Sequence, residues 1–197
     1  INFKYIFLSS GVIQTPILLF KSGIKKNIGN KFQIQPNLKI AVLFDKNIYP
    51  ENGTMMTRQI NEFSKDGFSI GGSNFSPSYL SMTIASAGKN ALSFLEQWQK
   101  TALYISLMKF NGIGKIRLIP FTNLPYISYK IHKNDFEIMK KSILKMAEGF
   151  FSLGAKKIIT PFKKFQIVES LNEVKDKILY KKNLEHVELS AVHGMSS

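Results

Sequence analysis

The N-terminal part of the chain passes from an apolar run through a turn into an amphipathic stretch. Residues 3–8 are rich in β-prone side chains, and this run ends at Ser9-Ser10-Gly11. Residues 12–22 then place apolar side chains at helical spacing before Gly23. Pro16 suits the first turn of a helix, because the N–H that proline lacks has no partner there. The pattern therefore predicts a strand, a tight turn and a helix.

The period of the apolar positions changes to two in the middle of the chain, which is typical of β-strands. This alternation predicts antiparallel strands at 38–45, 55–63 and 68–73. Helical spacing returns afterwards and predicts a short helix over 77–87 and a long helix over 91–110. Two further strands are predicted after these helices, at 115–120 and 126–131.

The most regular helical pattern covers residues 135–153. Asn134 is the predicted N-cap of this helix, and Glu137 lies three residues further on, as in a capping box. A short strand at 156–160 and a helix over 170–180 follow. The order of the elements indicates an α+β fold, in which a mainly antiparallel sheet is flanked by helices on one side.

Composition narrows the class of protein. The 197 residues are 44% hydrophobic and 12% aromatic, which is enough for a packed core and excludes disorder as the main state. The chain has no cysteine, which excludes a disulfide scaffold, a thiolate zinc site, an iron–sulfur cluster and a cysteine nucleophile. No apolar run approaches the roughly 20 residues of a membrane-spanning helix, so we expect no transmembrane segment.

The chain is strongly basic, with a formal net charge of +14. Such a charge favours nucleic acid or anionic lipid as a partner. However, only Arg58 and Arg117 among the 27 basic residues are arginine, the side chain that makes bidentate contacts with bases and phosphates. The lysines are scattered, with no block of five or more. We therefore expect solvated lysines and no nucleic-acid partner, and a lysine-rich module that binds polyanions is the alternative.

Histidines are the main candidates for chemistry, and the chain has three, His132, His186 and His193. No two of them have the i, i+4 spacing of a helical metal site, so we predict no metal centre. We expect His132 in a surface turn and His186 in a solvent-exposed ion pair. His193 differs because small residues surround it, which leaves room for a planar ligand beside its imidazole. Neither a Gly-x-Ser-x-Gly elbow nor a complete Gly-x-Gly-x-x-Gly loop is present.

Two segments near opposite ends of the chain resemble motifs of a single family. Residues 10–24 read Ser-Gly-Val-Ile-Gln-Thr-Pro-Ile-Leu-Leu-Phe-Lys-Ser-Gly-Ile. They resemble the second signature of the glucose–methanol–choline (GMC) flavin oxidoreductases, Gly-Ala-x-x-Thr-Pro-x-Leu-Leu-x-x-Ser-Gly-Ile-Gly. Val12 stands where the family has a small residue, and Lys25 where it has glycine. Residues 189–197 resemble the run His-x-x-Gly-Thr-Cys-x-Met-Gly, in which His193 takes the place of the family's active-site histidine.

A third segment, residues 27–36, is similar to the run Val-Gly-x-Asn-Leu-x-x-His-Pro that follows the second signature, with Gln35 in place of the histidine. The resemblance implies that 1–29 belong to an α/β FAD-binding domain, that 30–188 form a substrate-binding domain, and that 189–197 return to the FAD-binding domain. The family's ADP-binding glycine loop and its second active-site residue lie outside this chain, so we expect a part of a longer protein.

The resemblance also implies an activity, the oxidation of an alcohol CH–OH group by hydride transfer to FAD. His193 is the predicted catalytic base, because the family's histidine takes the hydroxyl proton. The predicted cofactor-binding residues are Gly11, Val12, Thr15 and Asn30. The predicted substrate-binding residues, on strands expected to form the pocket floor, are Phe68, Ile70 and Phe75.

The substrate and its acceptor stay open at this point. A small-molecule alcohol is the implied substrate, and the electron acceptor is oxygen, a quinone or a protein. Within the family, the alternative is a non-redox or photochemical relative, such as a hydroxynitrile lyase or a decarboxylase.

Overall fold

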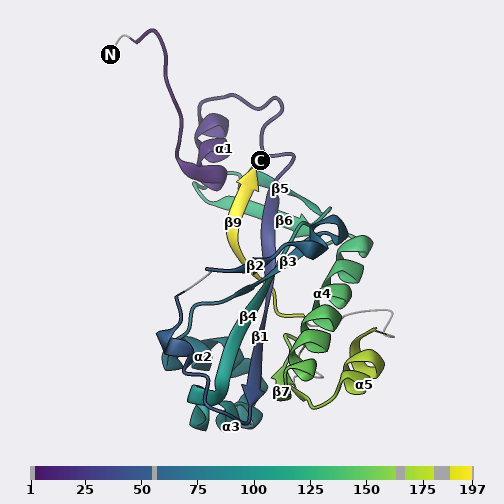
Figure 1. Ribbon diagram of the computed structural model, residues 1–197. Coiled ribbons are helices and arrows are strands. Elements are labelled where there is room, and N and C mark those ends of the chain that lie inside the picture. Colours follow the sequence, from purple (N-terminus) through teal and green to yellow (C-terminus); the bar gives the residue numbers. More distant parts are fainter. Residues whose placement is uncertain (1–2, 55–56, 163–166, 180–186, 197) are drawn as a thin grey trace. The chain divides into compact units, whose positions relative to one another are not determined.

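The computed structural model of the chain is shown in Figure 1. It describes residues 3–54, 57–162, 167–179 and 187–196. The chain forms two compact units. Unit 1 contains Ile1–Gln35, Phe110–Asp135 and Ala191–Ser197, and unit 2 contains Pro36–Lys109 and Phe136–Ser190.

Unit 2 is built on an antiparallel sheet with the strand order β2-β3-β4-β1-β7-β8. Its strands are β1 (Gln33–Phe44), β2 (Gln59–Ile60), β3 (Phe68–Gly72), β4 (Thr101–Met108), β7 (Ala155–Ile159) and β8 (Ile167–Val168). β9 (Ser190–Ser196), whose residues from Ala191 onward belong to unit 1, also pairs with β1. The predicted α+β fold with a mainly antiparallel sheet is confirmed.

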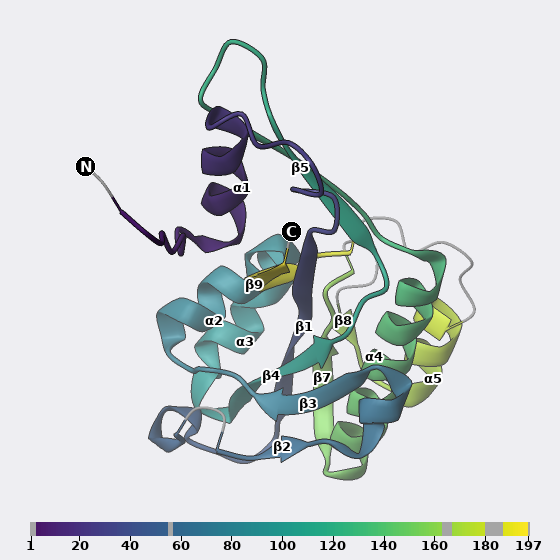
Figure 2. The ribbon, with the colours of Figure 1, turned by 90° about the horizontal axis from the view of Figure 1, so that it is seen from above.

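Helices cover both faces of this sheet (Figure 2). Ala41 of β1 and Leu103 of β4 lie opposite each other and pack with α2 (Pro77–Ile84) and α3 (Leu92–Glu96). The next residue, Tyr104, points to the other face, where its ring centroid lies 4.3 Å from that of Phe150 in α4 (Lys133–Ser152). The prediction of helices on one side is therefore wrong. The signal in the sequence was the continuous apolar run 40–43, all of which is buried. A strand that is covered on both faces does not alternate between apolar and polar residues.

One predicted helix is largely a strand in the structure. The sequence pattern predicts a helix over 91–110, but α3 ends at Glu96, and β4 begins at Thr101 after a short 3-10 turn. Every residue of β4 is buried or half-buried. An apolar run of this kind satisfies a helical period and a central strand equally well. Pairing with β1 on one side and β3 on the other favours the strand, because both edges of its backbone are then hydrogen-bonded.

Two other strand predictions need correction. Residues 3–8 form no strand, and large side chains there are exposed, with Phe7 at 91%. A β-prone run without a neighbouring strand leaves its backbone groups to water. The predicted strand over 55–63 is reduced to β2 and is followed by a 3-10 turn, Glu62–Asp66, while residues 55 and 56 lie outside the described residues.

The later elements of unit 2 follow the predictions closely. The predicted strand at 156–160 corresponds to β7, and the predicted helix over 77–87 begins as α2. α5 (Leu171–Val174) begins after Ser170, whose hydroxyl accepts the N–H of Glu173 at 3.2 Å, as a capping residue does.

Unit 1 contains α1 (Gly11–Lys21) and a hairpin of β5 (Ile113–Leu118) and β6 (Pro125–Lys130). These elements confirm the predicted helix over 12–22 and the two predicted strands within a few residues. The prediction of Pro16 in the first turn is wrong, because α1 begins at Gly11 and Pro16 lies in its interior. Ile17 of α1, Phe32 and Ile116 of β5 form its buried core. The hairpin thus belongs to the same compact unit as α1, whereas the domain boundaries predicted from the sequence place it within 30–188. The identity of these domains as FAD-binding and substrate-binding stays a prediction.

Candidate functional site

The start of α1 is exposed at Ser10 and Gly11. Gly11 begins the helix with a φ of +90°, in the left-handed region that favours glycine. The side chain of Ser10, the residue before the helix, makes no capping hydrogen bond. A Cβ placed on Gly11 would meet nothing within 4 Å. Because the first N–H groups of a helix carry partial positive charge, this end of α1 suits a polar or anionic edge of a ligand.

β9 approaches this helix start at Gly194. A Cβ placed on Gly194 would overlap with Cγ1 of Val12 and would lie 3.4 Å from Cε2 of Phe32. His193 is the preceding residue of β9, and it is exposed. Unit 1 therefore brings the strand that carries His193 against the first turn of α1. Thr15, the other predicted residue of α1, is half-buried one turn further along.

Asn30 lies on a loop that is held by the backbone of β5. Gly29, with a φ of +62°, packs so closely that an added Cβ would overlap with the carbonyl oxygen of Ile116. The carbonyl of Gly29 accepts the Ile116 N–H at 2.9 Å. Phe32 exchanges two backbone hydrogen bonds with Gly114, at 3.1 and 2.7 Å. The loop therefore has one defined path past the hairpin.

Arg117 fixes the side chain of Asn30. Its Nη1 donates to the carbonyl oxygens of Gly29 and Ile116 at 2.8 and 2.7 Å, and its Nη2 donates to Oδ1 of Asn30 at 2.6 Å. Because Oδ1 is turned toward the guanidinium, the amide nitrogen of Asn30 points away from it. This role of Arg117 was not predicted from the sequence. Its rarity was the available signal, because Arg117 is one of only two arginines in a lysine-rich chain.

A pocket of about 440 Å³ lies beside this pair within unit 1. Its lining includes Phe20 and Leu118 as apolar groups and Lys25 and Arg117 as cations. The combination of an aromatic ring with positive charge suits an anionic or planar ligand. Asn30 lies in the same lining, so three segments of unit 1 meet at this place.

The base of the hairpin is tied by the buried carboxylate of Asp135. It accepts the backbone N–H groups of Asn111, Gly112 and His132 at 2.7, 3.0 and 2.8 Å. Asp135 is fully buried. The prediction of Asn134 as the N-cap of α4 is therefore wrong, because α4 begins at Lys133 and the side chain of Asp135 bonds the preceding backbone.

Tyr129 packs over this hairpin base. Its hydroxyl donates to the carbonyl of Gly112 at 3.0 Å. Burial raises the pKa of Tyr129, and the charge of Asp135 raises it further. A Cβ on Gly112 or Gly114 would press on Tyr129. Close packing therefore explains these two glycines, and they form no dinucleotide-binding loop.

The predicted substrate-binding residues lie in unit 2. Phe68 and Ile70 are buried in β3. Ile70 lies opposite Ser106, two residues beyond Tyr104 in β4, so both predicted side chains face α4. Phe75 packs against the hydrophobic cluster of α2 and α3. Their contact with a substrate stays a prediction.

His132 and several lysines from adjacent pairs make ordinary contacts. His132 is exposed, and its Nδ1 accepts the N–H of Asn134 at 3.3 Å, while His186 lies outside the described residues. Four lysines from adjacent pairs each bind a carboxylate, in the ion pairs Lys140–Glu137, Lys141–Asp66, Lys156–Asp45 and Lys157–Glu169. These lysines are therefore occupied within unit 2.

In residues 3–54, 57–162, 167–179 and 187–196, no group of three histidine or acidic side chains is placed to hold a metal ion. Within these ranges no helix combines the length and the apolar character needed to cross a membrane.

Comparison with known proteins finds relatives of one kind. Over 154 residues the chain is 28% identical to an uncharacterized GMC-type oxidoreductase of Sinorhizobium fredii, covering 78% of this chain and 30% of that protein. Over 191 residues it is 23% identical to uncharacterized GMC-type oxidoreductases of two Mycobacterium tuberculosis strains, covering 95% of this chain and 30% of each. The chain thus spans 30% of the length of these curated relatives. No protein-family model matches the chain.

Proposed function

We propose, from the relationship of this chain to GMC-type oxidoreductases, that it is part of an FAD-dependent enzyme that oxidises the CH–OH group of an alcohol. The observation that carries this proposal is the close approach of Gly194 to Val12. These two residues belong to the two segments that resemble the family's motifs, and they lie far apart along the chain. Their contact in unit 1 is what a shared cofactor site requires.

The residues of unit 1 fit a flavin. The exposed start of α1 at Gly11 offers the partial positive charge of a helix N-terminus, and Asn30 offers an amide whose orientation Arg117 sets. Positive partial charge and an amide donor match the carbonyl and nitrogen acceptors on the edge of an isoalloxazine ring. When bound, FAD would supply the acceptor for the hydride that leaves the alcohol carbon.

His193 is the proposed base for this reaction. Its imidazole would accept the hydroxyl proton as the carbonyl product forms. The side chain is exposed on β9, so a substrate can reach it. Gly194 and Val12 would act on catalysis indirectly, because their contact sets where β9 passes the start of α1.

The test of this proposal uses the full-length protein. We expect it to purify with bound flavin, seen as visible flavin absorbance. His193→Ala should keep the flavin and lower kcat by about 10²–10⁴-fold, the usual contribution of a general base. His132→Ala is the matched control, because His132 is an exposed histidine of the hairpin base, and it should keep full turnover. A flavin-free protein, or an unchanged kcat in His193→Ala, contradicts the proposal.

A further inference from the structure

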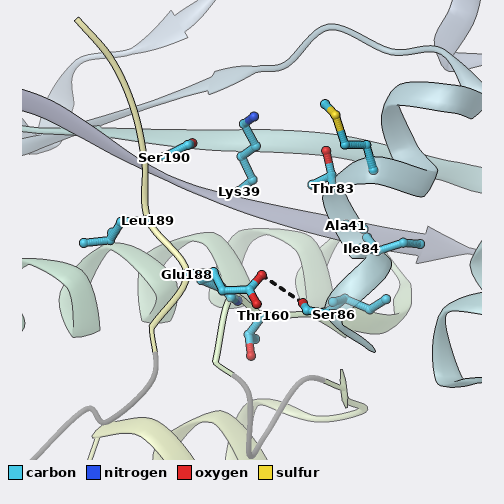
Figure 3. Close-up of a pocket in the computed structure, with 12 residues that line it drawn as sticks. Lys39, Ala41, Thr83, Ile84, Ser86, Thr160, Glu188, Leu189 and Ser190 are labelled. Carbon is cyan, nitrogen blue, oxygen red and sulfur yellow. Dashed lines mark hydrogen bonds between the residues drawn. The ribbon is translucent and has the colours of Figure 1, made fainter. Parts of the chain in front are cut away.

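Unit 2 contains a second pocket, on the face of the sheet that α2 covers (Figure 3). Its volume is about 250 Å³. The apolar part of its lining includes Ala41 of β1, Ile84 of α2 and Ile159 of β7, which belong to the hydrophobic cluster beneath that helix. Residues 188–190 form another wall. The pocket therefore has an apolar floor, formed by residues of the buried core, and polar groups around it.

Lys39 of β1 places a cation in this pocket. Its Nζ donates to the hydroxyl of Tyr79 at 2.6 Å and lies 4.8 Å from the centroid of the Tyr79 ring. These contacts hold the ammonium group in place but do not neutralise it. None of the ion pairs among the described residues involves Lys39. Lys39 therefore presents a positioned positive charge that lacks a carboxylate partner in the described chain.

Glu188 places an anion elsewhere in the same lining. Its Oε2 accepts the hydroxyl of Ser86 at 2.8 Å, and its backbone N–H donates to the carbonyl of Pro161 at 2.8 Å. Glu188, like Lys39, is absent from the ion pairs of the described residues. Figure 3 shows the Lys39 side chain rising away from Glu188, whose carboxylate turns toward Ser86. The pocket thus holds two separated charges of opposite sign.

We propose that this pocket binds a short-chain molecule with a carboxylate at one end and a hydroxyl or ammonium group at the other. The carboxylate would accept hydrogen bonds from Lys39, and the donor group would bind Glu188. The carbon chain between them would lie on the apolar floor. A volume of about 250 Å³ has room for a small molecule such as a four-carbon hydroxy acid.

The charges also define which molecules the pocket rejects. A dicarboxylate would place a negative group against Glu188, and a neutral diol would leave Lys39 without an anion. This proposal concerns unit 2 alone and does not require bound flavin. Its failure therefore leaves the proposed oxidoreductase function untouched, and the reverse is also true.

The first experiment compares ligands of one chain length by calorimetry on the full-length protein. The probes are γ-hydroxybutyrate, γ-aminobutyrate, butyrate, succinate and the four-carbon diol. We expect one or both of the first two to bind, at least about tenfold more tightly than the diol and succinate. Butyrate should fall between, because it keeps the carboxylate and lacks the donor. Equal binding of the diol, or no binding by either of the first two probes, overturns the proposal.

The second experiment uses variants at the two charges. Lys39→Met should weaken binding of the better probe by at least about tenfold, and Lys39→Arg should retain most of it. Lys46→Met is the control, because Lys46 is an exposed lysine just beyond the end of the same strand. Glu188→Gln should improve succinate relative to γ-hydroxybutyrate, since the repulsion is removed. Circular dichroism checks the fold of each variant, and unchanged affinity in a folded Lys39→Met protein refutes the assignment.

Discussion

The contact between Gly194 and Val12 makes a specific prediction about packing in unit 1. Gly194→Ala adds a Cβ that would overlap with Cγ1 of Val12 and crowd the ring of Phe32. Adding a methyl group to a packed site typically costs about 1–3 kcal/mol. Val12 is only half-buried and has some freedom to shift, so we expect a loss near the middle of that range, about 2 kcal/mol. Urea denaturation, compared at an unchanged m-value, measures this loss.

Two further variants show whether the loss arises from this contact. Val12→Ala removes Cγ1, so the double variant Gly194→Ala, Val12→Ala should recover part of the stability, with a coupling energy of about 1–2 kcal/mol. Gly149→Ala is the control, because Gly149 is exposed on α4 and an added Cβ there meets nothing within 4 Å. Alanine is preferred over glycine inside a helix by up to about 1 kcal/mol, so this variant should be neutral or more stable. Single-variant losses that add within about 0.5 kcal/mol would refute the contact.

Two other predictions concern the hairpin base. Asp135→Asn replaces a buried acceptor of three backbone N–H groups by an amide and should lower the free energy of unfolding by about 3 kcal/mol. Asp66→Asn, which removes only the exposed ion pair with Lys141, should change it by less than about 1 kcal/mol. A similar loss in both variants would contradict the stabilising role of the Asp135 carboxylate. The raised pKa of Tyr129 means that its protonated form stabilises the fold fully below the unfolded-state pKa of about 10, and that this contribution is lost as the pH rises through the folded-state pKa. Thermal unfolding should therefore show a smaller alkaline loss of stability in Tyr129→Phe than in the unchanged protein, and parallel curves would count against this role.

Val12 is larger than the residue that the family signature has at this position, and the fold accommodates it. The signature that residues 10–24 resemble has a small residue at this position, where the chain has valine. The structure places Gly194 against the valine side chain, so the missing Cβ on β9 makes room for the larger group on α1. Neither residue alone indicates this arrangement, because the two positions are far apart in the chain.

Local pattern was sufficient for several parts of this protein. The positions of α1, of the β5–β6 hairpin and of α4 follow from apolar spacing and from glycine at Gly23 and Gly154 beyond helix ends. The cap of α5 by Ser170 follows from residue type and spacing as well. These features depend on neighbours within a few residues, which is the range that a sequence pattern samples.

Other features depended on contacts between residues far apart in the chain. Residues 101–108 form a strand because β1 and β3 pair with both of their edges, and residues 3–8 form none because no neighbouring strand is present in the described chain. Local spacing does not indicate that Arg117 bonds Asn30, or that Lys39 and Glu188 line one pocket. The spacing of apolar residues indicates which side of a helix or strand is buried, but not which other element covers that side. The pairing of elements in the tertiary structure therefore determines where Arg117 meets Asn30 and where Lys39 and Glu188 line one pocket.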